Sequence, residues 1–206
     1  HVHEFSEPGW KVGGDYKVTD SSMMFASISY GFKGGSYDNR ALSTGDDPIG
    51  PEFLTAYEVG FKSELADNTL HLNLAAFYYE WEGMQLFESI GGIPNLINVP
   101  EIESKGIEAE FKWSPNENWY VQGSVGTANA EISDIEGIHP GSIAEVGKKV
   151  TKSPELTYNL LGSYTQPMSN GTLVLSMNYR YESDSYYTFK QITAADTAQS
   201  HGYLNA

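Results

Sequence analysis

Apolar and polar residues alternate along most of the chain, so that successive side chains fall on two different faces of an extended strand. The clearest example is the segment 69–81, where one face carries Leu70, Leu72, Leu74, Ala76 and Tyr78. The same period of two recurs in eight segments, at about 10–18, 24–32, 54–65, 69–81, 106–113, 119–125, 156–164 and 172–181. A ninth strand is expected to begin near Gly202. The pattern predicts an all-β, antiparallel sheet with one apolar face.

The connections between these segments alternate between short and long. Turn-forming residues mark short connections at 19–20, 67–68, 115–118 and 167–171. The intervening segments 34–53, 88–101, 132–152 and 184–200 are interpreted as long loops. Tight turns at one end and long loops at the other are typical of an up-and-down transmembrane β-barrel, whose tilted strands need about 10 residues to cross a bilayer. Trp113, Trp119 and Tyr16 stand close to short turns, where an interfacial girdle is expected.

Composition excludes several other classes of protein. The 206 residues include 12 Lys and Arg against 27 Asp and Glu, and the resulting net charge of −15 argues against a nucleic-acid partner. The chain has no Cys, which excludes disulfide scaffolds, Cys-ligated metals and thiol nucleophiles. Because it also has no Ser-His-Asp order, phosphate loop or dinucleotide fingerprint, we expect neither an enzyme nor a cofactor.

Several stretches resemble the barrel of TonB-dependent outer-membrane receptors. They are 51–65 (PEFLTAYEVGFKSEL) and 70–79 (LHLNLAAFYY), joined through Asp67-Asn68, with 29–35 (SYGFKGG) and 103–110 (ESKGIEAE). The resemblance implies a barrel of about 22 strands, closed by an N-terminal plug domain, in the outer membrane of a Gram-negative bacterium. It also implies import of a scarce nutrient, most often a ferric siderophore, with energy relayed by TonB.

The chain departs from that family in what it lacks. Residues 1–206 are interpreted as part of the barrel domain, and the plug, its TonB-contacting segment and the final strands are expected to lie elsewhere. The chain starts at His1 with no Met and no signal peptide, which favours a processed product or a fragment. Contact with TonB would therefore be made through the missing plug.

Two sets of residues are candidates for function. Six charged residues are predicted to face the barrel lumen, where they would contact the plug or guide substrate: Glu58, Lys62, Glu64, Glu108, Glu110 and Lys112. A hydrated lumen that tolerates mixed charge, or a glycosidase carboxylate pair, would explain them otherwise. Ligand contacts are predicted for loop residues, although a solvated loop or an upper aromatic girdle would also account for them: Tyr37, Asn39, Arg40, Phe87, Tyr186 and Tyr187. The five His residues are scattered, so no metal site is expected.

Two other protein classes stay open at this stage. Eight strands would suffice for a complete small outer-membrane barrel with a structural or adhesive role. The Trp and Tyr content would also suit a soluble, secreted, carbohydrate-binding β-sandwich. Within the receptor interpretation the small-molecule ligand is open among ferric siderophores, haem, cobalamin and oligosaccharides.

Overall fold

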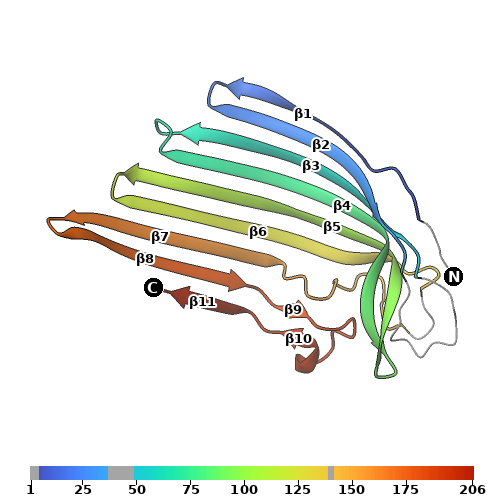
Figure 1. The fold of residues 1–206 in the computed structure, drawn as a ribbon. Coiled ribbons are helices and arrows are strands. Elements are labelled where there is room, and N and C mark those ends of the chain that lie inside the picture. The colour runs from blue at the N-terminus through green and yellow to red at the C-terminus, as the bar shows by residue number, and fades with distance from the viewer. Residues whose placement is uncertain (1–4, 37–48, 139–141) are drawn as a thin grey trace.

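The chain forms one curved, open antiparallel sheet of nine strands (Figure 1). The computed structural model describes residues 5–36, 49–138 and 142–206. The order across the sheet is β1-β2-β3-β4-β5-β6-β7-β8-β11. The strands are β1 (Trp10–Thr19), β2 (Ser22–Lys33), β3 (Glu52–Leu65), β4 (Leu70–Ile90), β5 (Ile93–Asn116), β6 (Trp119–Asp134), β7 (Leu156–Met168), β8 (Gly171–Glu182) and β11 (His201–Asn205).

The predicted meander is confirmed. Each of the first eight strands pairs with its neighbour in sequence, and the predicted ninth strand pairs with β8 from His201 onward. The four predicted short turns lie at one end of the sheet, the turn end, and the other connections lie at the opposite end, the loop end (Figure 1). The β3–β4 turn shows why its residues suit it, because Ala66, Asp67 and Asn68 all have positive φ, which Asn and Asp tolerate.

The prediction of a long loop over 88–101 is wrong. Strands β4 and β5 continue past the rest of the sheet and pair up to Ile90 and Ile93. Between them Gly91 and Gly92 have φ of 62° and 85°, as a two-residue hairpin turn with positive φ at both central positions requires. The predicted loop 132–152 lies about three residues further along the chain, because β6 runs to Asp134 and β7 begins at Leu156. The predicted loop 184–200 contains structure of its own.

The segment after β8 folds into a small unit. It contains β9 (Ser185–Tyr186), the short 3₁₀ helix η1 (Ala194–Asp196) and β10 (Thr197–Ala198), and β9 pairs with β10. This unit lies beside the extended β4–β5 hairpin at the loop end (Figure 1).

The sheet does not match the two alternative folds. In the described part of the chain β1 and β11 lie at opposite edges of a single sheet, so eight strands do not close into a small barrel. Nor do two sheets stack face to face as in a sandwich. None of the described helices is long and apolar enough to span a bilayer.

The strand registers confirm the two faces that the sequence predicts. The apolar face carries Tyr57 opposite Tyr78, Val59 opposite Ala76, and Phe61 opposite Leu74. Many of its large side chains are exposed, with Val12 at 69% and Ile107 at 61%. A face of this extent that no part of the described chain covers calls for an apolar medium or a partner.

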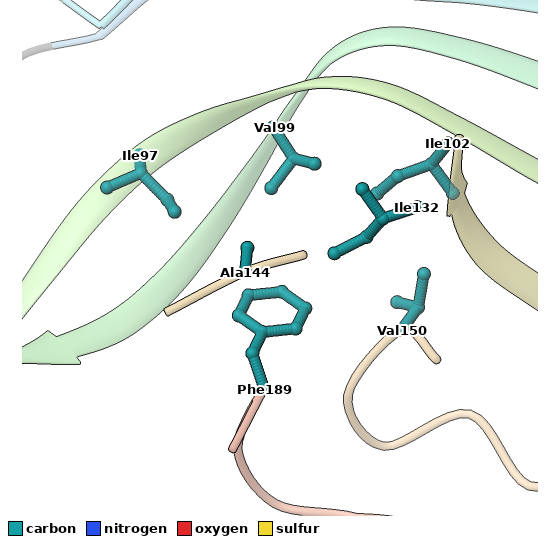
Figure 2. Packing of buried hydrophobic residues seen from close by; sticks show 7 residues of the cluster. All are labelled: Ile97, Val99, Ile102, Ile132, Ala144, Val150 and Phe189. Carbon is teal, nitrogen blue, oxygen red and sulfur yellow. The ribbon is translucent and has the colours of Figure 1, made fainter. Parts of the chain in front are cut away.

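The hydrophobic core sits at the loop end. Its buried members are Ile97, Val99, Ile102, Ile132, Ala144, Val150 and Phe189 (Figure 2). They come from β5, from β6, from the β6–β7 connection and from the unit after β8. Ile102 lies opposite Trp81 and Ile132 in the two neighbouring strands, on the side of the sheet opposite to the apolar face. The core therefore covers the non-apolar side of the sheet at its loop end.

Candidate functional site

The six residues predicted to face the lumen share one side of the sheet, here called the polar face. Strand β4 lies between the two strands that carry them, so the registers align charges in rows. One row is Lys62–Asn73–Glu110, and the next is Glu64–His71–Lys112. His71 Nδ1 lies 3.9 Å from the Glu64 carboxylate. The structure thus brings these side chains together, and lining of a lumen by this face stays a prediction.

Aromatic rings on the polar face fit against glycines and charges. A Cβ on Gly60 would lie 2.3 Å from the Phe25 ring, and one on Gly106 would lie 2.6 Å from the Phe77 ring, so both sites need Gly. Phe77 stacks on Tyr79, whose hydroxyl donates a 2.8 Å hydrogen bond to Glu58. The Lys62 ammonium stands 5.5 Å from the Phe25 centroid. These contacts hold Glu58 and Lys62 against aromatic side chains of the polar face.

The apolar face is bounded by aromatic residues at both ends. Toward the turn end lie Tyr16, Trp113, Trp119 and Tyr164, with the last two rings 4.9 Å apart. Toward the loop end lie Tyr30, Tyr57, Tyr78, Tyr158 and Tyr181. Beyond them the same face turns polar, with Glu80 opposite Glu103 and Glu103 opposite Glu131. The apolar stretch on β4, Leu70–Tyr78, has the length that a tilted strand needs to cross a hydrocarbon layer, about 9–11 residues.

An ion cluster ties the β6–β7 connection to β6. The Lys149 ammonium lies 2.7 Å from Glu131 and 2.9 Å from Glu155, and it also contacts Asn129. Burial by itself would lower the pKa of Lys149, but its hydrogen bonds to the two carboxylates outweigh that effect and raise the pKa. Lys149 therefore stays charged and holds the carboxylates of Glu131 and Glu155 close together. This cluster lies on the loop-end side of the aromatic residues that bound the apolar face.

The predicted ligand contacts lie on separate segments. Phe87 is on the extended part of β4 and is 53% exposed, and Tyr187 follows β9 and is 56% exposed. Tyr186 is in β9, half-buried, and its carbonyl accepts a hydrogen bond from the Lys152 amide. Tyr37, Asn39 and Arg40 lie outside the described residues. The ligand role of all six stays a prediction.

Two amide side chains at the loop end escaped sequence analysis, Gln85, which is buried, and Asn98, which is half-buried. Asn98 exchanges hydrogen bonds with the backbone of Gly50 at 2.8 and 3.0 Å and also donates to the Gly83 carbonyl. Gln85 donates to the carbonyls of Gly34 and Gly50, both at 3.0 Å. Their partners are up to 51 residues away in sequence, so no local pattern marks them. They join the base of the hairpin to the β2–β3 connection.

No metal site emerges from the part of the chain that the structure describes. There, no group of three His, Asp or Glu side chains is placed to hold an ion. The expected lack of a metal site stays a prediction.

Comparison with known proteins gives consistent matches. The family described as "TonB dependent receptor-like, beta-barrel" matches residues 3–206. The pesticin receptor of Yersinia enterocolitica is 33% identical over 114 residues, which are 53% of this chain and 16% of that protein. The metal-pseudopaline receptor CntO of Pseudomonas aeruginosa is 26% identical over 155 residues, 75% of this chain and 20% of its own.

Solved structures agree on the fold. The ferric yersiniabactin uptake receptor FyuA from Yersinia pestis superposes with a TM-score of 0.77 at 19% identity, over 94% of this chain and 28% of that one. The ferric preacinetobactin receptor BauA from Acinetobacter baumannii gives 0.71 at 21% identity, with the same coverage. The chain thus spans less than a third of the length of these relatives. By the family match over residues 3–206, the chain belongs to the TonB-dependent receptors, and it corresponds to part of their β-barrel.

Proposed function

We propose that this chain is part of the barrel wall of an outer-membrane receptor that imports a scarce nutrient, first of all a ferric siderophore or related metal chelate. The observation that carries the proposal is the family match over residues 3–206. Relatives whose names are those of siderophore and metal receptors support this ligand class. No covalent chemistry is assigned to the chain.

The two faces of the sheet support a place in a membrane. The apolar face between its aromatic boundaries would contact lipid, and the polar face with Lys62, Glu108 and Glu110 would line a hydrated interior. In this arrangement the loop end faces the outside and the turn end faces the periplasm, since barrels of this class have short periplasmic turns.

Ligand recognition would take place at the loop end, and energy would come from TonB. Phe87, Tyr186 and Tyr187 offer aromatic surfaces, and Tyr37, Asn39 and Arg40 would add polar and cationic groups for an anionic chelate. TonB would act through a plug segment outside residues 1–206.

The test is radioactive iron uptake by the source bacterium after deletion of the complete receptor gene. A panel of ferric catecholate, phenolate and hydroxamate chelates is supplied, with and without a protonophore. We expect loss of energy-dependent uptake of one chelate class and its return on complementation. Unchanged uptake of every chelate, together with unchanged uptake of other metal chelates, would overturn the proposal.

A further inference from the structure

Residues 184–200, here called the cap, are held together from within. Asp196 lies at the centre: its carboxylate accepts hydrogen bonds from the Thr188 hydroxyl at 3.0 Å and from the Thr193 amide and hydroxyl at 3.0 and 2.7 Å. The Tyr187 amide donates to the Asp196 carbonyl at 2.7 Å. At the base, the Ser200 amide donates to the Asp184 carboxylate and β9 pairs with β10. All of these contacts join residues within 184–200, so none of them is lost if the cap separates from its neighbours.

Among the described residues, the packing and hydrogen-bond contacts between the cap and the rest of the molecule gather at one place, here called the seat. Phe189, 1% exposed, is the one residue of the cap among the buried residues of the described core, and it points between Ala144 and Val150 (Figure 2). Beside it, the Gln191 side chain takes the place of a strand partner: it accepts from the Lys149 amide at 3.3 Å and donates to the Lys149 carbonyl at 2.6 Å. The Lys152 amide donates to the Tyr186 carbonyl at 2.7 Å.

The rest of the boundary is open. A polar cavity of about 370 Å³ separates the base of the cap from the β6–β7 connection, with Asp184, Tyr186 and Ser200 on one side and Lys149, Ser153 and Glu155 on the other. Away from the seat the cap is exposed, as Ile192 at 74% shows. Few contacts therefore need to break for the cap to separate.

The seat lies over the polar face. Phe189 packs in the cluster of Ile102 and Ile132, which stand on the same side of the sheet as Glu108 and Glu110. When the cap is docked it covers the polar face at the loop end, and when it leaves the seat this part of the polar face is exposed.

We propose that residues 184–200 form a prefolded cap that leaves its seat as one unit, with Phe189 as the anchor that holds it over the polar face at the loop end. The movement itself is independent of what the receptor carries. Its consequence, controlled access to the barrel interior, rests on the proposed function.

Hydrogen exchange followed by mass spectrometry on the complete receptor tests the proposal without any ligand. Two sets of amides report separately. The seat amides of Lys149 and Lys152 bond to the cap, whereas the cap amides of Tyr187, Thr193 and Asp196 bond within it. In Phe189→Ala we expect seat exchange to rise about tenfold or more, because a buried aromatic anchor is lost, and cap exchange to stay within about twofold.

Control variants separate the outcomes. Ile192→Ala, on the exposed side of the cap, should leave both sets unchanged. Gln191→Ala removes the two bonds to Lys149 but spares the core, so it should speed seat exchange even where Phe189→Ala fails to assemble. If seat and cap amides accelerate together, the cap unfolds rather than undocks and the proposal is wrong. It is equally wrong if neither set responds to Phe189→Ala or Gln191→Ala.

Discussion

At the scale of single residues, adjacent positions on β4 have opposite surroundings. Leu72 lies on the apolar face opposite Phe111, and Asn73 lies on the polar face opposite Lys62 and Glu110. We expect Leu72→Arg in the complete receptor to lower the free energy of unfolding by about 2–4 kcal/mol if the position lies near the bilayer centre. Asn73→Arg should cost less than about 1 kcal/mol, because its face is hydrated. Denaturant titration in lipid vesicles measures the free energy of unfolding of both variants.

Leu72→Met is the matched control for this pair, since it keeps the apolar character and nearly the volume of the side chain. Equal costs for the two arginine variants would contradict the assignment of the faces.

The facing of individual residues could be predicted because a strand alternates with a period of two whatever its partners are. The registers have Glu58, Lys62, Glu64, Glu108, Glu110 and Lys112 on one side of the sheet, as the alternation predicts, and their place in a lumen stays a prediction. The burial of Phe189 and Gln85 and the hydrogen bonds of Asn98 could not be predicted, because they depend on contacts between distant segments. Their neighbours in sequence show no pattern that separates them from exposed loop residues.

At the scale of elements, the extended β4–β5 hairpin shows where the alternation of apolar and polar residues does not suffice to predict a strand. Pro94 and Pro100 interrupt the segment 93–101, and proline is unfavourable inside a sheet. Here β5 pairs with β6 only from Glu101 onward, so among the described residues the part of β5 before Glu101 has a free edge, which tolerates proline. The pair Gly91-Gly92 suits a two-residue hairpin turn, but the interpretation of 88–101 as a long loop did not use it.

Asn98 should be essential for the base of this hairpin. Replacement by Leu takes the Asn98 partner from the Gly50 amide and the Gly83 carbonyl, while the Gly50 carbonyl keeps its hydrogen bond from Gln85. Each unsatisfied buried group costs about 1–3 kcal/mol, so we expect local opening of the hairpin well before global unfolding. Hydrogen exchange measures this local opening, and we expect faster exchange of residues 84–99 in Asn98→Leu. Asn95→Leu is the control, because Asn95 is half-buried in the same strand but its side chain donates to its near neighbour Ile93. A similar effect there would contradict the prediction.

The cap should lose its internal structure in acid. Hydrogen bonds from Thr193 and Thr188 lower the pKa of Asp196 to about 2, from an ordinary value of 3.8. Because the folded cap favours the carboxylate, the stabilisation is complete above pH 3.8 and is lost as the pH falls toward 2. Pepsin cleavage within residues 184–200 should accelerate across that range, relative to a free peptide of the same sequence.

Asp196→Asn serves as the comparison for this pH effect. It should be cleaved quickly at every pH in the range, because the amide cannot replace the charged acceptor. A cleavage ratio of wild-type cap to free peptide that stays constant from pH 4 to pH 2 would rule out the role of Asp196.

At the scale of the whole molecule, the sheet that the described residues form has two unpaired edges. All residues of β1 are exposed, and β11 pairs only with β8. Free backbone groups at such edges pair readily with other chains, and the apolar face adds to the tendency. Residues 1–206 produced alone and refolded in detergent should therefore form oligomers, whereas the complete receptor should elute as a monomer in size-exclusion chromatography with light scattering.

Refolding the chain together with the remaining strands of its receptor distinguishes oligomers that form by strand pairing at the sheet edges from oligomers that form by nonspecific hydrophobic association. If β1 and β11 are the reactive parts, supplying their natural neighbours should reduce the oligomers and yield a heat-modifiable complex, because closure of a barrel removes both edges. A 206-residue chain that stays monomeric and heat-modifiable alone would instead mean that β1 and β11 pair with each other, as in a small closed barrel.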